Sequence, residues 1–482
     1  MNLNEPSPDL LNRLAQRLGS KGFTTDPVDL DPWLTDWRGR VKGVATALLS
    51  PATREEVADI VAMAAAERVA IVPQGGNTSM VAGATPGAGS LLLSLRRMNA
   101  IRSISAEENI AVAEAGVILS DLHRAAGAAG CRFPLSLAAK DSATIGGLVS
   151  TNAGGTQVLR FGPMRSLLLG IEAVLPDGTL FEGLSALRKD NRGYDLRQLL
   201  AGAEGTLGVV TAASLKLEPA IGQRVVVWAG LPTSEDALRL LRLLEHRMGD
   251  AIEAFELVPA AALELVLTRI DRMRDPLSGK HRCYALIEAV FADPDSGGQE
   301  MMEAALVQAM DAGLVEDASI AASEAQAEAF WALRENISEA ERLDGISVKH
   351  DISVAVSNMP GFMQFAAREV EASFEGARVL AFGHLGDGNI HFNVRNPEGT
   401  EAQPWFDANN AAVSRLVHDL VTAAGGSISA EHGIGRLKLA EFARLAEPAR
   451  LGALRAIKQA LDPLGIMNPG KLVPLACNTP PP

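Results

Sequence analysis

Short apolar runs alternate with polar segments along the first part of the chain. Before Pro73 this pattern predicts a helix over residues 10–18, a strand over 45–49, a helix that begins after Thr53, and a strand over 69–72. The Thr53 hydroxyl can cap the second helix, and the acidic residues that follow it favour the positive end of the helix dipole. The segment therefore indicates a strand, a helix and a second strand.

Glycine-rich loops separate the next predicted strands, and Pro219 and Gly222 mark a boundary after them. The strands before the boundary are expected at 91–95, 110–113, 170–175 and 209–217. Those after it are expected at 225–228, 284–290, 346–355 and 377–383, with helices from Ser234 onward, within 297–342, and at 360–373, 405–424 and 435–463. We predict an α+β protein with segments 1–219, 220–425 and 426–482.

Composition excludes several classes of protein. The 482 residues suffice for two or three domains, and 47% apolar and 21% charged residues are ordinary for a globular chain. The net charge of -14 disfavours nucleic acid as a partner, because phosphate binding needs a surplus of Lys and Arg. The three cysteines (Cys131, Cys283 and Cys477) form no CxxC pair, so an iron–sulfur cluster or a zinc ribbon is not expected.

The first residues are polar and acidic, and no apolar run of membrane-spanning length follows. We therefore expect a cytoplasmic protein without a signal peptide or a transmembrane segment.

A glycine pair follows the strand predicted to end at Pro73. Adjacent glycines let backbone N–H groups approach a ligand closely, and nearby Asn, Thr and Ser side chains add donors, as in a loop that holds a pyrophosphate. By itself the loop is more readily explained as an ordinary tight turn. Its residues are Pro73, Gln74, Gly75, Gly76, Asn77, Thr78 and Ser79.

Two further glycine-rich segments favour the ligand interpretation. One carries two glycine pairs eight residues apart in a stretch almost free of charge, against which a flat ring and a phosphate chain could lie. The other adds small residues and one acidic residue before a β-branched strand. Their candidate residues are Thr144, Gly146, Gly147, Asn152, Gly154, Gly155, Glu204 and Gly205.

Two other nucleotide signatures are missing from the sequence. No GxGxxG lies between a strand and a helix, so a dinucleotide site of the Rossmann type has little support. The run from Gly465 to Lys471 has the spacing of a phosphate loop, but Leu472 stands where Ser or Thr should bind magnesium.

Two histidines flank a glycine-containing loop in the segment 383–394. From Ile390 onward apolar and polar residues alternate, which places His391 and Asn393 on one face of a strand. Gly386 and Gly388 permit a tight loop that would bring His384 beside His391. Two imidazoles that converge are typical of a metal site.

Glu431 and His432 lie in a glycine-flanked loop after the long helix. Two histidines and one glutamate would leave an open coordination position, as in catalytic zinc and non-haem iron sites. From the residue types alone, a metal site and a plain polar network both remain open.

Arg334 and Ser338 are four residues apart and are expected on one face of a single helix, and Lys349 follows in a strand. An arginine and a lysine near a ligand pocket suit a carboxylate, although solvated surface charge is the alternative.

The three glycine-rich segments, in this order and with these spacings, resemble the FAD-binding domain of the vanillyl-alcohol-oxidase flavoprotein family. The resemblance to the family as a whole covers residues 40–472. The segment 189–196 also fits. This resemblance implies a two-subdomain FAD-binding domain within 1–219, a sheet-and-helix substrate domain at 220–425, and a helical segment at 426–482 that completes the active site. It also implies that FAD contacts Asp141, Leu207, Val209, Asn468 and Lys471 in addition to the loop residues above. Because the first loop lacks a histidine, we expect the FAD to be non-covalent.

The second half resembles the D-2-hydroxy-acid dehydrogenase branch of that family, and within it most closely the enzymes that oxidise 2-hydroxyglutarate. The resemblance implies metal ligands at His384, His391 and Glu431, with zinc as the expected ion, and a catalytic base at His432. The implied substrate residues are Arg334, Ser338, Lys349 and Asn393, where Ser338 replaces the threonine of the branch.

These assignments predict oxidation of a small 2-hydroxy acid (2-hydroxyglutarate, malate or lactate) to the 2-keto acid, with hydride transfer from C2 to flavin N5. The electrons would pass to an electron-transfer flavoprotein, a quinone or a cytochrome, and the family suggests a homodimer. A flavin subunit of a glycolate- or lactate-oxidising complex, and an enzyme similar to alkylglycerone-phosphate synthase, remain as alternatives.

Overall fold

The computed structural model describes residues 3–187 and 189–475, so Cys477 lies outside the described residues. The chain divides into two compact units. Unit 1 comprises Met1–Gly155, Gly162–Ala220 and Glu431–Pro482, and unit 2 comprises Thr156–Phe161 and Ile221–Ala430. The division after Ala220 lies close to the boundary that Pro219 and Gly222 suggest.

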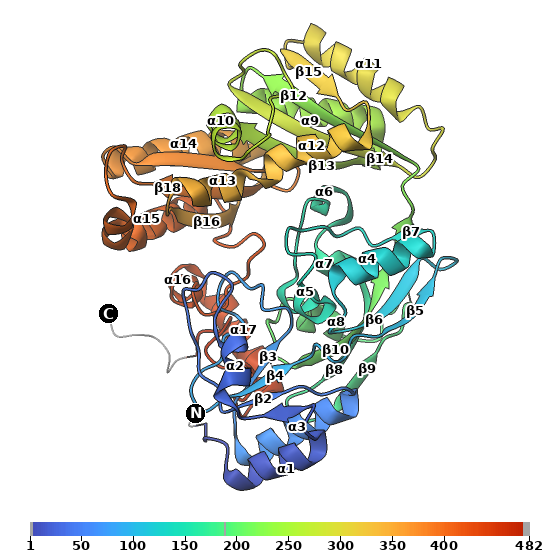
Figure 1. Ribbon diagram of the computed structural model, residues 1–482, viewed down its shortest axis with the longest axis vertical. Coiled ribbons are helices and arrows are strands. Elements are labelled where there is room, and N and C mark those ends of the chain that lie inside the picture. Colours follow the sequence, from blue (N-terminus) through green and yellow to red (C-terminus); the bar gives the residue numbers. More distant parts are fainter. Residues whose placement is uncertain (1–2, 188, 476–482) are drawn as a thin grey trace. The chain divides into compact units, whose positions relative to one another are not determined.

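The first part of unit 1 is a small four-stranded sheet in the order β1-β2-β4-β3, with α1 and α3 packed against it (Figure 1). Strands β2, β4 and β3 are parallel, and β1 pairs with β2 in the antiparallel sense. The Thr53 hydroxyl caps α3, as expected, by accepting a hydrogen bond from the amide of Glu56 at 3.2 Å. The elements are α1 (Pro8–Leu18), β1 (Phe23–Thr24), α2 (Pro27–Leu34), β2 (Ala47–Leu49), α3 (Arg54–Glu67), β3 (Ile71–Gln74) and β4 (Leu91–Ser94).

The second part of unit 1 is an antiparallel five-stranded sheet in the order β5-β6-β10-β8-β9. The short strands β7 and β11 pair with each other beside it. Its elements are β5 (Ile101–Ser105), β6 (Ile110–Glu114), α4 (Leu119–Ala128), β7 (Cys131–Arg132), α5 (Ile145–Thr151), α7 (Met164–Leu167), β8 (Leu168–Val174), β9 (Leu180–Gly183), α8 (Leu196–Leu200), β10 (Val209–Lys216) and β11 (Glu218–Pro219).

The C-terminal segment predicted at 426–482 does not form a separate unit, because from Glu431 onward it belongs to unit 1. Ile466 and Met467 are fully buried in the core formed by α1, α3 and β3. The amide of Ile71 donates to the carbonyl of Ile466, and the amide of Asn468 donates to the carbonyl of Ile71, each at 2.8 Å. The segment after α16 (Leu439–Leu445) and α17 (Pro448–Leu461) thus runs beside β3.

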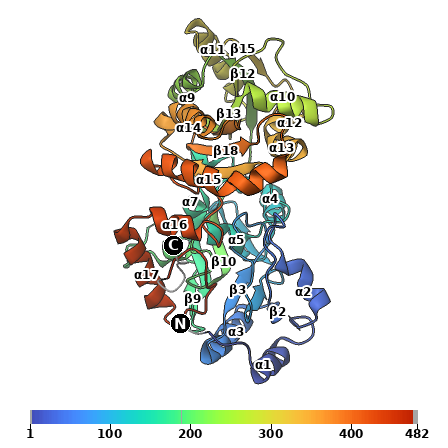
Figure 2. The same ribbon diagram turned by 90° about the vertical axis from the view of Figure 1, so that its left-hand side faces the viewer.

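Unit 2 is built on one antiparallel sheet of seven strands in the order β15-β12-β14-β13-β17-β18-β16. Helices α10, α12 and α13 pack together against one face, while α9, α11, α14 and α15 cover the other (Figures 1 and 2). Its elements are α6 (Val158–Phe161), β12 (Gln223–Leu231), α9 (Ser234–Met248), η1 (Gly249–Ala251), β13 (Ile252–Pro259), α10 (Ala260–Arg269), β14 (Cys283–Phe291), α11 (Gly298–Asp311), β15 (Asp317–Ile320), α12 (Glu324–Glu335), α13 (Ile337–Asp344), β16 (Val348–Ser353), η2 (Val356–Asn358), α14 (Met359–Ser373), β17 (Arg378–His384), β18 (Asn389–Arg395) and α15 (Ala402–Ala423).

Strand β13 is absent from the sequence-based prediction. Glu253 and Glu256 interrupt its apolar residues on both faces, so the segment shows neither a continuous apolar run nor a clean alternation. Both carboxylates are fully buried, and each pairs with an arginine: Glu253 with Arg160, and Glu256 with Arg334. These pairings make a buried strand with two acidic residues possible.

The helical region predicted within 297–342 is interrupted by strand β15 and again at Asn336. The expectation that Arg334 and Ser338 share one helix is therefore wrong, because Arg334 belongs to α12 and Ser338 to α13. Arg334 is buried and Ser338 is exposed. In the described part of the chain, no helix combines the length and the apolar character that a membrane crossing requires.

Candidate active site

The predicted pair of histidines lies on the hairpin formed by β17 and β18. Phe382 stands opposite His391 in the ladder, so His384, two residues further along β17, is the diagonal neighbour of His391 on the same face. The centroids of the two imidazole rings are 5.5 Å apart. Gly388 in the connecting loop has φ +81°, and a Cβ there would lie 2.1 Å from the carbonyl oxygen of Val354. The turn thus requires glycine at this position, as the loop sequence suggests.

Strand β16 extends this polar face. Lys349 stands opposite Asn393 and Asp351 stands opposite His391, so three neighbouring strands present polar side chains on one face. The face is the one that α12 and α13 cover, since Asn393 Nδ2 donates to Glu341 Oε2 in α13 at 2.6 Å. The alternation in the sequence therefore predicts the correct face for His391 and Asn393.

Glu431 completes a three-residue cluster with His384 and His391. One ligand atom from each residue lies within 4.8 Å of the others. Glu431 directly follows Ala430, whose amide donates to the carbonyl of Asp351 in β16 at 3.4 Å. Two imidazoles and one carboxylate form a donor set that suits zinc or another divalent transition metal and leaves coordination positions open.

Glu256 is the residue at this site that the sequence analysis missed. It stands opposite His384 in the ladder between β13 and β17. Its Oε1 lies 2.5 Å from His384 Nδ1, and its Oε2 accepts a hydrogen bond from Arg334 Nε at 2.8 Å. Burial raises the pKa of Glu256, but the charges of His384 and Arg334 outweigh burial and hold the pKa at about 2. No signal in the sequence marks Glu256, because its function depends on the unpredicted strand β13.

The predicted carboxylate-binding residues lie on both sides of this cluster. The guanidinium of Arg334 lies over the ring of Phe382, 4.8 Å from its centroid. Lys349 Nζ lies 3.7 Å from Glu341 Oε2, and Glu341 is fully buried in α13. Burial raises the pKa of Glu341, while the charges of Lys349 and Arg395 oppose that rise. A buried carboxylate thus holds Lys349 and Asn393 together beside the histidines.

His432 lies in the loop that follows Glu431, and Glu204 anchors that loop. Oε1 of Glu204 accepts a hydrogen bond from the amide of Ile434 at 2.8 Å, and Oε2 accepts one from the amide of Gly435 at 2.7 Å. Burial raises the pKa of Glu204, and these two hydrogen bonds oppose the rise. Both carboxylate oxygens of this predicted cofactor residue are thus engaged with the chain itself.

The predicted cofactor loops meet within unit 1. A Cβ at Gly75 would lie 2.2 Å from Thr144 Oγ1, and one at Gly76 would lie 2.0 Å from the carbonyl oxygen of Ser142. The glycine pair thus allows the first loop to touch the second, backbone against backbone. The Thr144 hydroxyl is buried without a hydrogen-bond partner in the described residues, as expected where a polar ligand would supply one.

Several side chains of the first loop form hydrogen bonds with the chain itself. Gln74 Nε2 donates to the carbonyls of Trp33 and Ala84, and Asn77 Nδ2 donates to the carbonyl of Thr35. The hydroxyl of Ser79 accepts hydrogen bonds from the chain's own amides. These contacts shape the loop, and its backbone N–H groups are further candidate donors to a ligand.

Other predicted cofactor residues support the same loops. Asn468 Nδ2 donates to the carbonyls of Gly83 and Glu204, which joins the C-terminal segment to two of the glycine-rich loops. Asn152 has φ 49° at the end of α5, and its Oδ1 accepts a hydrogen bond from the backbone amide of Arg165. The remaining predicted residues are exposed (Asp141), partly buried (Pro73, Thr78, Gly147, Gly154) or buried (Gly146, Gly155, Gly205, Leu207, Val209).

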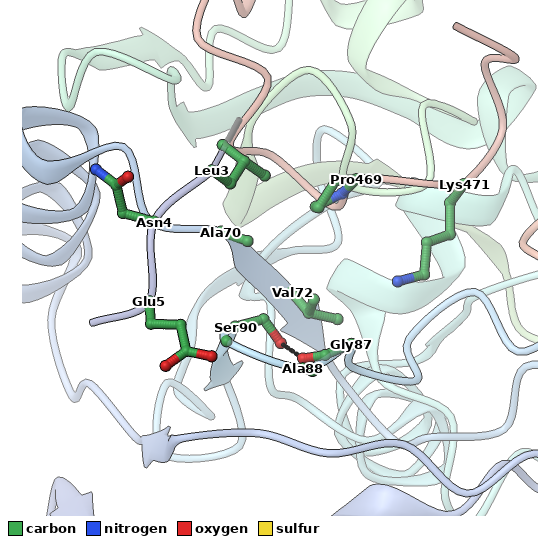
Figure 3. Close-up of a pocket in the computed structure, with 11 residues that line it drawn as sticks. Leu3, Asn4, Glu5, Ala70, Val72, Gly87, Ala88, Ser90, Pro469 and Lys471 are labelled. Atoms are coloured by element: carbon green, nitrogen blue, oxygen red, sulfur yellow. Dashed lines mark hydrogen bonds between the residues drawn. The ribbon is translucent and has the colours of Figure 1, made fainter. Parts of the chain in front are cut away.

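Lys471 lines a cavity of about 280 Å³ beside β3, together with Val72, Gly87 and Leu3. Its side chain extends into the space next to Val72 (Figure 3). Burial, with a smaller contribution from Arg436, lowers the pKa of Lys471 to about 8. The amino group has no ion pair with the described residues, so it suits an anionic or polar ligand group.

Comparisons with known proteins define the family. Residues 45–183 match the FAD binding domain model, and residues 222–472 match the model for the C-terminal domain of FAD linked oxidases. Among curated proteins, the chain is 37% identical to the mitochondrial D-2-hydroxyglutarate dehydrogenase of Bos taurus, covering 93% of this chain and 81% of that protein. It is 36% identical to the D-2-hydroxyglutarate dehydrogenase of Xanthomonas citri, covering 95% and 96%.

Solved structures share the fold at much lower identity. p-Cresol methylhydroxylase with substrate bound superposes with a TM-score of 0.76 at 14% identity, covering 96% of both chains. Alkyldihydroxyacetonephosphate synthase superposes with a TM-score of 0.73 at 17% identity, covering 97% of this chain and 87% of that one. The predicted fold class is thus confirmed: an FAD-binding domain combined with a second, sheet-and-helix domain. By these matches the chain belongs to the family of FAD-linked oxidases that includes the D-2-hydroxyglutarate dehydrogenases.

Proposed function

We propose that this protein oxidises a D-2-hydroxy acid of the 2-hydroxyglutarate class to the corresponding 2-keto acid, with FAD and a divalent metal. The observation that carries the proposal is the polar face of unit 2, where His384, His391, Asn393 and Lys349 share three neighbouring strands beside Arg334. The relatives named D-2-hydroxyglutarate dehydrogenase support the substrate class. Malate and lactate are the nearest alternatives.

Arg334 and Lys349 would bind carboxylate oxygens of the substrate. The guanidinium of Arg334 is a planar fork that matches a carboxylate, and it stacks over the ring of Phe382. Lys349 brings a point charge, and Asn393 beside it offers an amide for a further oxygen. Ser338, which is exposed on α13, is the remaining candidate for a substrate contact.

His384, His391 and Glu431 would hold the metal, for which zinc is our first candidate. A bound metal would lower the pKa of the 2-hydroxyl group, as it lowers the pKa of bound water. His432, which we propose as the general base, would take the hydroxyl proton, and Glu204 would keep its loop in place through the amides of Ile434 and Gly435.

The glycine-rich loops of unit 1 would hold the FAD, and the bound flavin would supply the hydride acceptor for the reaction. The backbone N–H groups around Gly75 and Gly76 and the Thr144 hydroxyl suit the pyrophosphate, and Lys471 suits another polar group of the cofactor. We propose non-covalent attachment, because the first loop contains no histidine.

Two further features of the proposal, the electron acceptor and the oligomeric state, rest on the family alone. We propose that electrons leave to an electron-transfer flavoprotein, a quinone or a cytochrome, and that the protein is a homodimer. The cytoplasmic location remains a prediction, since several eukaryotic relatives are named as mitochondrial.

An anaerobic titration of the purified protein tests the proposal. D-2-hydroxyglutarate, D-malate and D-lactate are added in turn while the flavin absorbance is followed, with the L-enantiomers as controls. Bleaching by one D-hydroxy acid, and not by its enantiomer, is the expected result. A flavin band that none of them bleaches would contradict the proposed reaction while leaving the fold and the cofactor intact.

A further inference from the structure

Glu256 is a charged residue in the middle of a protein sheet, with no exposed surface at all. A buried carboxylate is costly unless polar groups satisfy it, and here a histidine and an arginine do so, one on each oxygen. Both of these partners belong to the proposed active site. The arrangement therefore joins a proposed metal ligand and a proposed substrate residue through one side chain.

The contact with His384 determines which ring nitrogen is left for a metal. A carboxylate can only accept hydrogen bonds, so the contact of 2.5 Å between Oε1 and Nδ1 places the hydrogen on Nδ1. In the neutral imidazole, which is the form that binds a metal, Nε2 of His384 then carries the lone pair. Outer-shell carboxylates bound to a ligating histidine act in this way in metal sites generally, by fixing both the tautomer and the orientation of the ring.

The contact with Arg334 sets the direction of the guanidinium. The hydrogen bond to Oε2 uses Nε, one of the five N–H donors of the group, and the ring of Phe382 fixes its plane. The terminal amino groups remain for a forked contact with a carboxylate. The Glu256 carboxylate thus orients both the imidazole of His384 and the guanidinium of Arg334.

We infer that Glu256 is the positioning residue of this site, which holds His384 for metal binding and Arg334 for the substrate carboxylate at the same time. This inference rests on the proposed function. It predicts that removal of the Glu256 carboxylate weakens metal binding and substrate binding together, although Glu256 itself touches neither.

Glu288 provides a matched control on the adjacent strand β14. It is also buried, it accepts hydrogen bonds from Arg224 at 2.9 Å and from Trp331 at 2.6 Å, and none of these contacts involves a proposed ligand residue. A general effect of removing a buried carboxylate from this sheet should therefore appear in Glu288→Gln as well.

The decisive experiment compares the zinc affinity of wild type, Glu256→Gln, Glu256→Ala and Glu288→Gln by competition with a chelator of known affinity. An amide offers an acceptor on one side only, so Glu256→Gln can accept from Nδ1–H of His384 or from Nε–H of Arg334 but not from both. We expect the zinc affinity of both Glu256 variants to fall by about 10- to 100-fold, and that of Glu288→Gln to match wild type. Flavin content and the circular dichroism spectrum should remain as in wild type for the isosteric Glu256→Gln.

Two further readouts separate a positioning role from a merely structural one. In metal-free protein, the nitrogen chemical shifts of His384 should indicate hydrogen on Nδ1 in wild type and a mixed population of tautomers in Glu256→Ala. The KM for the substrate should rise in Glu256→Gln and not in Glu288→Gln.

Unchanged zinc affinity in folded Glu256→Gln, with wild type binding zinc, would overturn the inference and leave the proposed function standing. If wild type itself binds no zinc, the metal assignment and this inference both fail, and the flavin titration still decides the reaction.

Discussion

Replacement of Arg334 by lysine should separate charge from geometry at the proposed carboxylate site. Arg334 already uses Nε to bond Glu256, and its terminal amino groups remain available for a substrate carboxylate. The ammonium group of a lysine has three donors on a single nitrogen and no planar fork, so it cannot bond Glu256 as Nε does and also form a forked contact with the substrate carboxylate. Arg334→Lys therefore keeps the positive charge in the buried site and removes the second interaction.

The magnitude of the effect follows from the strength of one charged hydrogen bond. Such a bond contributes about 1.5–3 kcal/mol, and about 1.4 kcal/mol corresponds to a tenfold change in an equilibrium constant. Removal of one bond between Arg334 and the substrate thus predicts a fall in kcat/KM of roughly 10- to 150-fold. Because this bond is formed with the bound substrate, most of the change should appear in KM.

Steady-state kinetics with an artificial electron acceptor, together with the anaerobic Kd for flavin reduction, measure this effect. Arg224→Lys is the matched control, because Arg224 in β12 likewise pairs with a buried glutamate of the unit 2 sheet, Glu288. The control should lose stability without losing substrate affinity. If folded Arg334→Lys retains the wild-type kcat/KM, Arg334 does not bind the substrate carboxylate.

Three other predictions concern the cofactor domain. Gly76→Ala adds a Cβ 2.0 Å from the Ser142 carbonyl oxygen and should reduce bound flavin, measured by absorbance of the purified protein, whereas Gly127→Ala, where a Cβ meets nothing within 4 Å, should not. Burial opposes ionisation of Glu172, but hydrogen bonds, first from Arg102, outweigh burial and lower its pKa from 4.5. The stability that Glu172 supplies is therefore present above pH 4.5 and is lost as the pH falls below it. Glu172→Gln should lower the free energy of unfolding in urea by about 3–5 kcal/mol at pH 7 and by much less near pH 3. An equal loss at both pH values would contradict this assignment. Glu204→Gln should destabilise the protein by about 1–3 kcal/mol and make the loop around His432 more sensitive to proteolysis, with unchanged digestion as the contrary result.

Local patterns of the sequence predict one side of the site well. The alternation from Ile390 to Val394 fixes which residues of β18 face together, and the glycines before it permit the hairpin that places His384 next to His391. Both inferences depend only on residues within a dozen positions of one another. The tautomer and orientation of His384, in contrast, depend on Glu256, which lies 128 residues earlier.

Interactions over long sequence distances account for what the sequence does not predict. Glu256 looks incompatible with a buried strand, because its partners Arg334 and His384 cannot be found by periodicity. For the same reason the sequence does not show that the amide nitrogens of Gln74 and Asn77 donate to carbonyls of a segment about 40 residues earlier. The sequence shows which groups can form hydrogen bonds, and the fold decides which partner takes them.

The proposed site is built on the sheet of unit 2 and not on its loops alone, because only the sheet holds its side chains in rows. The antiparallel register fixes the lateral order of Lys349, Asn393 and Leu380 in one row, of Asp351, His391 and Phe382 in the next, and of Ser353, Asn389, His384 and Glu256 in the third. A shift of one residue in any of these strands would turn its polar side chains to the opposite face, where α14 and α15 pack. Buried apolar residues on that opposite face, such as Ile390, Phe392 and Val394, make such a shift costly. The core of the sheet therefore stabilises the fold and at the same time holds the proposed metal and substrate residues in register.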